Sequence, residues 1–285
     1  MNQNNQKVDF ICIGGNKCAT TWLTEILRPH SMLNISVNKE PSFFNWNFNK
    51  GFEWYFKNWK NEKGKKGEFS THYLYNSIAL NRIYSYFPDV KIIIMLRNPY
   101  ERSLSHLRHL AREKLQKDSV HMIRENQEII NNSLYYNYLK TVFEIFDKEN
   151  IHIVFFDEIK NEPRRVYKEI CSFLEVKSDF FPSNLQKKIG RGYYPRYETL
   201  QRLKSKIGKM LRQNNLHNII VFSKKIGISE LFKIINNDPS KKEVFYLPKS
   251  EIQRFIVDLN KLKGFLESKY IENWIGEIHA VSNKE

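Results

Sequence analysis

One short stretch near the N-terminus, VDFICIGGNKCATTW at Val8–Trp22, limits the possible folds more than any other part of the chain. Its apolar run predicts a buried strand over residues 8–14, its two glycines predict a tight turn, and a helix should follow from Thr20 to near Pro29. Such a turn directs backbone N–H groups at one point, where the helix dipole adds partial positive charge. The stretch therefore predicts an anion site in an α/β fold.

The position of Lys17 separates this loop from the familiar loop of metal-dependent NTPases. That loop, G-x-x-x-x-G-K-[ST], places its lysine directly before the hydroxyl residue that binds Mg²⁺, whereas Lys17 comes three residues before Thr20. Asp157 ends a later strand and superficially fits a metal ligand, but a helix cap is the simpler interpretation. We therefore expect an anion site without metal, formed by Gly15, Asn16, Lys17, Cys18, Ala19, Thr20 and Thr21.

A second cation follows the clearest buried strand, VKIIIML at residues 90–96. Arg97 ends this strand, and the carboxyl end of a central strand is where open α/β sheets bind ligands. A helix should then begin, with Asn98 as its cap, Pro99 in its first turn and Glu101 completing a capping box. Ser105 lies about two turns into that helix, so Arg97 and Ser105 are candidates for holding a second phosphate.

A third strand is predicted over 151–156 and an amphipathic helix from Pro163. Strands that alternate with helices indicate a P-loop-like parallel β-sheet flanked by helices. Residues 186–218 are basic and interrupted by glycine and proline, and a long helical pattern runs from Pro248 to about Tyr270. We expect a single domain over 1–285, with a nucleotide-binding core at about 8–200 and an irregular and helical C-terminal extension at about 201–285.

The composition restricts the class of protein and its partners. The 285 residues carry a net charge of +15, which favours anionic partners, although codon bias can also enrich lysine. Cys12, Cys18 and Cys171 show no metal-ligand spacing and no disulfide framework, which favours a reducing compartment. The polar N-terminus lacks the apolar core of a signal peptide, and no apolar stretch approaches the roughly 20 residues that span a bilayer. We expect a cytoplasmic protein without stable membrane insertion and without a nucleic-acid partner; its oligomeric state cannot be read from the sequence.

Several segments together resemble the sulfotransferases that use 3′-phosphoadenosine 5′-phosphosulfate (PAPS). IGGNKCATTWL resembles their 5′-phosphosulfate loop, and IIIMLRNPYERSLSHL resembles their 3′-phosphate motif with Arg97 and Ser105 at the matching places. NKEPSFFNW resembles the segment that carries the catalytic glutamate in heparan-sulfate and related bacterial members. GEFSTHYLYN and FFDEIKNEP also follow in the family's order, so the resemblance covers about residues 8–200.

The resemblance implies a sulfotransferase that takes PAPS as donor, releases the desulfated nucleotide PAP and needs no metal. Lys17 would neutralise charge on the leaving 5′-phosphate, and Glu40 would take the proton from an acceptor hydroxyl or amino group. The resemblance favours a carbohydrate as the acceptor, with another small molecule as the alternative. His72 and His106 are alternative bases. A plainer interpretation of Glu40 is a surface carboxylate paired with Lys39.

The sequence departs from the family pattern at two places and offers two candidates for a third feature. Ala19 replaces a glycine of the usual loop, which adds strain if that backbone needs positive φ. Phe69 stands where carbohydrate-modifying relatives often place a lysine. The late Gly-Arg loop of relatives is matched by Gly190 and Arg191 in KKIGRGYYPR, with Arg196 as a competing candidate.

The sequence leaves two other functions possible and leaves the role of one aromatic stretch undecided. A P-loop small-molecule kinase would need Mg²⁺ and ATP, and a non-catalytic polyanion-binding protein would use the basic 186–212 region. The aromatic stretch 43–60 contains Trp46 and Trp54, which are candidates for lining an acceptor cleft, while core packing is the better interpretation for most of its rings.

Overall fold

The chain forms two compact units from discontinuous segments. A computed structural model describes residues 6–59, 63–114, 118–186, 196–213, 219, 222–223, 226–238 and 245–283. The first unit comprises Met1–Arg102, Asn131–Gly190 and Lys249–Glu285, and the second comprises Ser103–Ile130 and Arg191–Pro248. These boundaries differ from the division near residue 200 that we expected, and the single domain stays a prediction.

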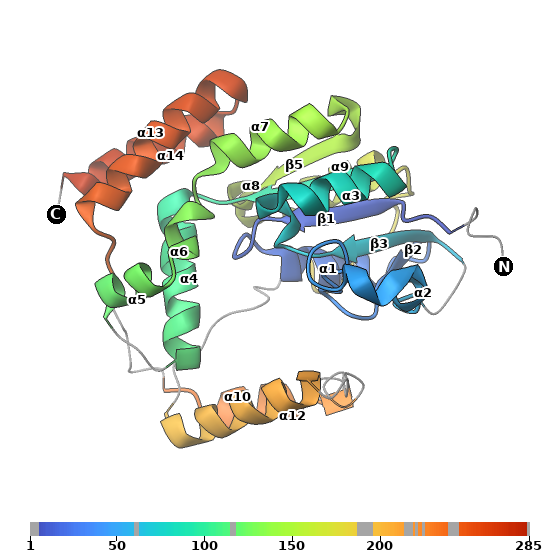
Figure 1. Ribbon diagram of the computed structural model, residues 1–285, viewed down its shortest axis with the longest axis horizontal. Coiled ribbons are helices and arrows are strands. Elements are labelled where there is room, and N and C mark those ends of the chain that lie inside the picture. Colours follow the sequence, from blue (N-terminus) through green and yellow to red (C-terminus); the bar gives the residue numbers. More distant parts are fainter. Residues whose placement is uncertain are drawn as a thin grey trace. The chain divides into compact units, whose positions relative to one another are not determined.

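The first unit is built on a five-stranded parallel sheet with the strand order β2-β3-β1-β4-β5 (Figure 1). The strands are β1 (Phe10–Gly14), β2 (Leu33–Ile35), β3 (Lys65–Phe69), β4 (Lys91–Leu96) and β5 (Ile151–Phe155). The predicted parallel α/β fold and three of these strands are thereby confirmed. β2 and β3 were not predicted, because LNI and KKGEF are short and carry no continuous apolar run.

The helices of the first unit cover this sheet. They are α1 (Thr20–Leu27), α2 (Gly51–Phe56), α3 (Ser77–Tyr86), α7 (Tyr135–Ile145), α8 (Phe156–Asn161), α9 (Pro163–Phe173), α13 (Lys249–Phe265) and α14 (Lys269–Ser282), while α4 (Pro99–Lys114) continues into the second unit. Short 3₁₀ turns occur at η2 (Phe48–Lys50), η3 (Tyr73–Tyr75) and η4 (Lys148–Asn150).

Alternate residues of the central strands supply the core. Phe10, Cys12, Ile93 and Met95 form one cluster with buried side chains of α1 and α9. α7 packs against α3 and α13, and α13 packs against α14. Because both central strands are buried on each face, they need the continuous apolar sequences that made them predictable.

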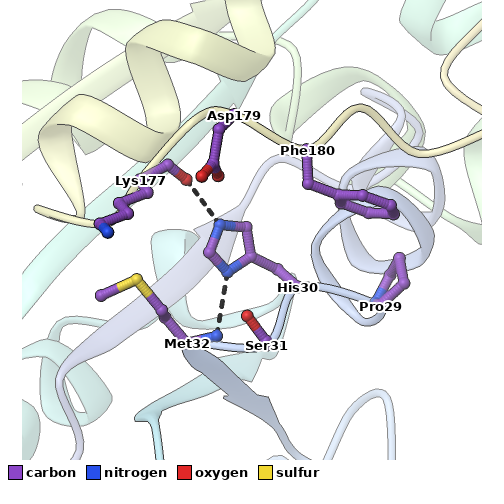
Figure 2. A pocket seen from close by; sticks show the side chains of 7 residues that line it. All are labelled: Pro29, His30, Ser31, Met32, Lys177, Asp179 and Phe180. Carbon is purple, nitrogen blue, oxygen red and sulfur yellow. Dashed lines mark hydrogen bonds between the residues drawn. The ribbon is translucent and has the colours of Figure 1, made fainter.

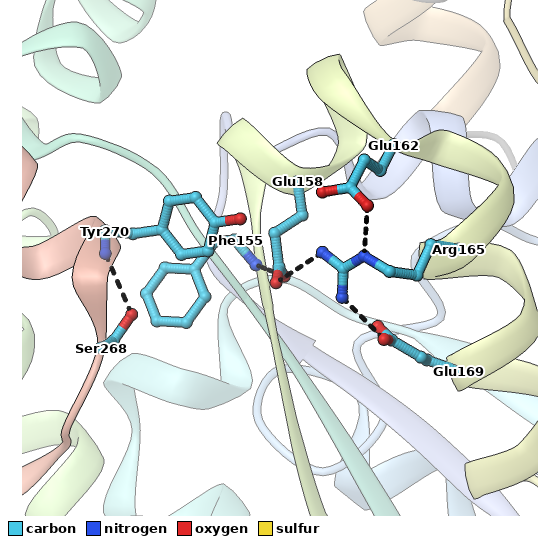
Figure 3. Close-up of polar contacts among 7 residues, drawn as sticks. All are labelled: Phe155, Glu158, Glu162, Arg165, Glu169, Ser268 and Tyr270. Carbon is cyan, nitrogen blue, oxygen red and sulfur yellow. Dashed lines mark hydrogen bonds and ion pairs between the residues drawn. The ribbon is translucent and has the colours of Figure 1, made fainter.

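A network of charges joins α8 to α9 (Figure 3). Arg165 contacts Glu158 at 3.2 Å, Glu162 at 2.9 Å and Glu169 at 2.6 Å, and Glu158 also accepts a hydrogen bond from the Phe155 N–H at the start of α8. These hydrogen bonds, foremost the one to Glu169, raise the pKa of Arg165. The guanidinium thus holds the short α8 against α9 at the end of β5.

The C-terminal third is helical as predicted, and the structure defines its helices more closely. The long helical pattern from Pro248 to Tyr270 is two helices, because Ser268 interrupts it and its hydroxyl accepts a hydrogen bond from the Tyr270 N–H of α14. The basic region, in which no helix was specifically predicted, contains a regular helix, α10 (Glu198–Gln213).

The second unit is helical in the part that the structure describes. It contains most of α4, followed by α5 (Ser119–Glu125), most of α6 (Glu128–Asn131), α10 and α12 (Ile228–Ile235). Its buried apolar side chains among the described residues are Leu104, Leu107, Ala111, Met122, Ile123, Ile129, Ile130, Phe245 and Leu247. Among the described residues of the whole chain, no helix is long and apolar enough to cross a membrane.

Candidate active site

The loop after β1 requires its glycines for steric reasons. Gly14 has φ 142°, and a Cβ there would lie 2.6 Å from the Thr71 carbonyl oxygen. A Cβ on Gly15 would lie 2.8 Å from the Tyr75 hydroxyl and 3.3 Å from the Met95 carbonyl oxygen. Side chains at both positions would therefore push the loop away from the neighbouring strands, β3 and β4.

The backbone of the same loop turns left-handed twice before α1 begins. Lys17 has φ 65° and Ala19 has φ 72°. The strain anticipated for alanine in place of glycine is therefore present, at a typical cost of about 1 kcal/mol. Ala19 is the N-cap residue of α1 and supplies no side-chain hydrogen bond to the first turn. The N–H groups at the start of α1 thus lack a capping side chain, which suits an oxyanion.

Asn16 is held in place by a buried arginine that sequence reasoning missed. The Asn16 Oδ1 accepts a hydrogen bond of 2.7 Å from Arg102 Nη1 and one of 3.5 Å from the Tyr75 hydroxyl. Arg102 is fully buried. Its signal in the sequence was weak, since it is one of several basic residues in the helix that begins at Pro99.

Cys18 forms part of the floor beneath this loop. Its thiol is fully buried and donates to the Asn16 carbonyl oxygen at 3.4 Å. Burial raises the pKa of the Cys18 thiol to about 11, against the opposing effect of Arg102 and Arg97. A neutral thiol of this kind packs the loop and is a poor nucleophile. Thr20 is also buried, at the first position of α1.

Arg97 lies at the carboxyl end of β4, beside the loop. Its Nη1 lies 3.5 Å from the Lys17 carbonyl oxygen, its Nη2 contacts Glu101 at 3.1 Å, and its guanidinium lies 4.5 Å from the centre of the Phe156 ring. The backbone carbonyl of Arg97 accepts a hydrogen bond from the Tyr135 hydroxyl at 2.7 Å. The Arg97 Nε is buried and has no hydrogen-bond partner among the described residues. An anion that accepts from this group would relieve its desolvation cost.

The helix that follows Arg97 begins as predicted, with one difference. Asn98 caps α4, since its Oδ1 accepts from the N–H groups of Tyr100 at 3.0 Å and Glu101 at 3.3 Å. The Glu101 carboxylate, which we expected to complete a capping box, is directed at Arg97. Ser105 is half-buried on α4 in the second unit, and its role beside Arg97 stays a prediction.

Glu40 lies in the segment between β2 and η2 and contacts the loop helix through a lysine. Lys39 Nζ donates to the Thr21 hydroxyl at 2.7 Å and lies 3.6 Å from Glu40 Oε1. The Thr71 hydroxyl, just beyond β3, lies 3.5 Å from the other Glu40 oxygen. Glu40 is thus both the lysine-paired carboxylate of the plainer interpretation and a group next to the loop. Sequence reasoning considered Lys39 only as a partner of Glu40 and missed its contact with Thr21, because that contact depends on the fold.

A buried carboxylate anchors the segment that carries Glu40. Glu68 is fully buried and accepts hydrogen bonds from the hydroxyls of Tyr55, Ser70 (2.6 Å) and Tyr73 (2.6 Å). Burial raises the pKa of Glu68, against the effect of these three hydroxyls.

The same hydroxyls hold the backbone that follows Glu40. The Ser70 hydroxyl accepts from the Ser42 N–H at 3.0 Å, and the Tyr73 hydroxyl accepts from the Phe44 N–H at 3.1 Å. Glu68 therefore positions the Glu40 segment through two intermediate side chains.

The aromatic stretch 43–60 divides between core and surface. Phe43, Phe44 and Tyr55 are fully buried, so core packing was the correct interpretation for them. Trp46 is 64% exposed, and its ring centre lies 4.9 Å from that of His72, which places an accessible aromatic pair beside Thr71. Trp54 is partly buried, and Lys50 Nζ lies 4.6 Å from its ring centre.

The structure gives the surroundings of four further candidates. Asp157 is not a helix cap: it lies in the first turn of α8 and accepts a hydrogen bond of 2.9 Å from the Trp274 indole. Phe69 is buried edge-on against Phe10, so this position cannot supply the lysine of relatives. His106 is buried in the second unit, and the Arg196 N–H donates to the Asn236 carbonyl there.

Gly190 and Arg191 lie outside the described residues. Within the part of the chain that the structure describes, no group of three or more His, Cys, Asp and Glu side chains is arranged to hold a metal ion.

A separate pocket lies beyond the C-terminal end of α1, and Figure 2 shows its lining. It measures about 530 Å³ and is lined by Pro29, His30, Ser31, Met32, Lys177, Asp179 and Phe180. Both ring nitrogens of His30 are engaged, one with the Lys177 carbonyl at 2.7 Å and one with the Met32 N–H at 3.2 Å (Figure 2). His30 is therefore a satisfied structural histidine, and the pocket lies at the end of α1 opposite to the anion loop.

Comparison with known proteins gives relatives of one kind. The chain matches the sulfotransferase domain over residues 7–217. It is 26% identical over 215 residues to the bifunctional heparan sulfate N-deacetylase/N-sulfotransferase 1 of Caenorhabditis briggsae, covering 66% of this chain and 25% of that protein. It is 25% identical over 201 residues to the human heparan sulfate glucosamine 3-O-sulfotransferase 5, covering 65% of this chain and 58% of that protein.

A solved structure agrees with these sequence matches. A sulfotransferase from Alicyclobacillus acidocaldarius is 26% identical, with a TM-score of 0.58, over 67% of this chain and 87% of that chain. The chain spans about a quarter of the length of the nematode relatives that it matches. The domain match nevertheless extends over well more than half of this sequence and includes the loop, Glu40 and Arg97, and on that basis the chain belongs to the sulfotransferase family.

Proposed function

We propose that this protein transfers a sulfuryl group from PAPS to a hydroxyl or amino group of a carbohydrate acceptor. The observation that carries the proposal is the pairing of two cationic groups at the carboxyl ends of adjacent strands. Lys17 follows β1 and Arg97 follows β4, and Arg97 Nη1 lies 3.5 Å from the Lys17 carbonyl oxygen. Sulfotransferases as a family use PAPS, a nucleotide with phosphate at two positions.

The residues present fit such a donor. The uncapped start of α1 and Lys17 suit its 5′-phosphosulfate, with Gly15 and Ala19 shaping the approach. Arg97, whose buried Nε lacks a partner among the described residues, suits its 3′-phosphate, with Ser105 as the predicted second contact. When bound, the donor supplies the sulfuryl group and a phosphate as leaving group.

The acceptor side is formed by the segment that carries Glu40. Glu40 would hold the proton released by the acceptor, and Lys39 and Thr71 orient its two oxygens. The exposed Trp46 ring beside His72 offers a flat apolar face of the kind on which sugar rings stack. The heparan sulfate enzymes among the relatives support a carbohydrate acceptor.

The two rival functions receive less support. A kinase of the P-loop type needs a Mg²⁺ ligand at the end of a neighbouring strand, and Asp157, the residue available, is engaged by the Trp274 indole. A polyanion-binding protein without catalysis needs no ordered loop, whereas Gly14 and Gly15 leave no room for any other residue type.

Calorimetry in EDTA tests the proposal through the 3′-phosphate. PAP should bind without metal and more tightly than AMP, because loss of the 3′-phosphate removes charge-assisted hydrogen bonds of roughly 1.5–3 kcal/mol each. Arg97→Ala should abolish most of that difference. Arg254→Ala removes an arginine paired with Glu251 on α13 and serves as the control.

Measurements of turnover on the same samples distinguish a loss of nucleotide binding from a loss of sulfate transfer. Glu40→Gln should keep PAP affinity and lose sulfate transfer to a glycan acceptor, while Glu53→Gln on α2 should keep both. Equal affinity for AMP and PAP in the wild-type protein would contradict the proposal. An active Glu40→Gln protein would move the base role to His72 or His106.

A further inference from the structure

The α10 helix of the second unit presents an apolar stripe to solvent. Leu200, Leu203 and Ile207 are 41%, 55% and 45% exposed. Their spacing of three and four residues places them on one side of the helix. Gln201, on another side of α10, is buried. The helix therefore turns its apolar side outward and a polar residue inward, the reverse of a helix that packs on a protein core.

The α12 helix also exposes apolar side chains. Ile228, Leu231, Ile234 and Ile235 are 53%, 57%, 75% and 55% exposed. By contrast, the amphipathic helix α9 of the first unit buries Val166, Tyr167, Ile170 and Cys171. We call seven of the exposed apolar side chains of α10 and α12 the outer apolar face: Leu200, Leu203, Ile207, Ile228, Leu231, Ile234 and Ile235.

The two helices are held together as a pair. The Asn236 side chain, directly after α12, accepts from the Tyr197 N–H at 2.7 Å and donates to the Tyr197 carbonyl at 3.3 Å, directly before α10. Lys204 Nζ lies 4.2 Å from the centre of the Phe232 ring. The exposure of the apolar residues is therefore a property of a joined helix pair and not of two separate, frayed segments.

Positive charge borders the outer apolar face. The sequence of α10 contains five Lys or Arg residues and one Glu. Lys204 follows Leu203 and Lys206 precedes Ile207, so at about 100° per residue the two lysines lie on opposite sides of the stripe. Arg202 and Lys206 are exposed. An apolar stripe between cations matches the layering of an anionic bilayer surface, with acyl chains beneath charged headgroups.

We propose that the α10–α12 pair docks on the surface of an anionic lipid bilayer, with the outer apolar face inserted at the level of the headgroups. A second copy of this chain is a poorer partner for the same face, because two such faces would bring α10 helices of like charge together. A polyanionic glycan would satisfy the lysines and leave the apolar side chains in water. Interfacial docking of this kind needs no membrane-spanning helix.

Vesicle flotation with the full chain tests the proposal. The protein should bind phosphatidylcholine vesicles that contain about 30% phosphatidylserine, and binding should weaken in pure phosphatidylcholine and at high salt. Leu203→Glu with Ile207→Glu should lower the partition coefficient by about tenfold or more, since both changes replace inserted apolar groups by charges that repel the surface. Leu231→Glu provides an independent variant on α12.

Matched control variants distinguish an effect of the outer apolar face from a general effect of charge or hydrophobicity on vesicle binding. Ile78→Glu with Val257→Glu changes two exposed apolar residues of the first unit, which are 62% and 48% exposed, and should leave binding unchanged. Arg202→Glu with Lys206→Glu should weaken binding about fivefold or more for each charge. Lys148→Glu with Lys261→Glu carries the same net charge change on exposed residues of the first unit and should have a much smaller effect.

Three outcomes would overturn the proposal. The wild-type protein does not float with anionic vesicles, or it binds neutral and anionic vesicles equally. Alternatively, Leu203→Glu with Ile207→Glu binds like wild type while circular dichroism shows both proteins folded. Finally, sedimentation shows self-association that these substitutions abolish, without vesicle binding, which would assign the face to a second copy of the chain.

Discussion

At the scale of single residues, Lys17 has the most specific position in the site. It occupies left-handed backbone in the loop after β1, with its carbonyl oxygen facing Arg97. An NTPase lysine reaches the β- and γ-phosphates of a triphosphate. A lysine placed earlier in the loop suits a shorter donor, in which a phosphate is followed directly by sulfate. Its charge should matter most as the bridging oxygen becomes anionic.

Lys17→Met should therefore lower kcat by about 100-fold or more, the scale of losing one preorganised charge-stabilising group. PAP affinity should fall less, because the contacts of the 3′-phosphate remain. Lys17→Arg should rescue only part of the rate, since a planar guanidinium replaces a compact charge poorly. Single-turnover sulfate transfer and PAP calorimetry measure the two effects.

Lys57→Met, directly after α2, removes an exposed lysine paired with Glu53 and is the control for this change. If Lys17→Met lost PAP affinity and transfer rate in equal proportion, Lys17 would be a plain binding residue. The role assigned here to the charge of Lys17 in the transition state would then be wrong.

At the scale of elements, β3 links the core to the acceptor side of the site. Its Glu68 carboxylate is buried and accepts hydrogen bonds from the hydroxyls of Ser70 and Tyr73. These two hydroxyls in turn accept hydrogen bonds from the backbone N–H groups of Ser42 and Phe44. Thr71, just beyond the same strand, contacts Glu40 directly. A short edge-side strand thus determines where the proposed base lies.

Glu68→Gln should lower kcat and leave PAP affinity nearly unchanged, because it loosens the Glu40 segment and spares the β1 loop. The amide group places a donor against a hydroxyl donor, which should destabilise the protein by roughly 1–3 kcal/mol. Glu53→Gln, at an exposed glutamate of α2, should change neither quantity. Unaltered turnover in a folded Glu68→Gln protein would exclude the positioning role.

The same variant carries a defined pH dependence. Because burial raises the pKa of Glu68 above its ordinary value of 4.5, the folded protein binds this proton more tightly than the unfolded chain. The stability that tighter proton binding at Glu68 contributes is fully present at pH values below the ordinary pKa. It is lost as the pH rises through the pKa of Glu68 in the folded protein. The difference in free energy of unfolding between wild type and Glu68→Gln, measured by urea titrations at a series of pH values, should therefore narrow over the range above the ordinary pKa. A difference that widens over this range would show that Glu68 ionises readily in the folded state.

At the scale of the whole molecule, the net charge of +15 sets the long-range behaviour. The charge is spread over both units and includes the basic α10 helix. A field of this sign raises the local concentration of anionic ligands and is screened by salt. On the proposed function, charged and uncharged acceptors should therefore respond differently to ionic strength.

The KM for a sulfated glycan acceptor should rise severalfold between about 50 mM and about 300 mM NaCl, because screening shortens the range of attraction. The KM for an unsulfated acceptor of the same length should change much less. Initial rates at saturating PAPS measure both values. An equal response of the two acceptors would show that the net charge does not contribute to acceptor binding.

The sequence by itself determined the central architecture and the chemistry of the loop. β1, β4 and β5 are apolar runs, and Asn98 with Pro99 marks the start of α4, because these signals depend only on neighbouring residues. The glycines, Lys17 and Arg97 were identified for the same reason. The consequence of Ala19 for the backbone also followed from local geometry.

Only the tertiary structure decided the features that depend on residues far apart in the chain. β2 and β3 become strands by pairing with the sheet, and their own sequences are too short and polar to predict it. Lys39 gains its contact with Thr21, Arg102 its contact with Asn16 and Asp157 its contact with Trp274 only when these segments fold together. Sequence periodicity indicates which side of a helix or strand is apolar. The partner of each side chain depends instead on how the helices and strands pack together. That packing positions Glu40, the proposed base, and buries Arg102 behind the loop.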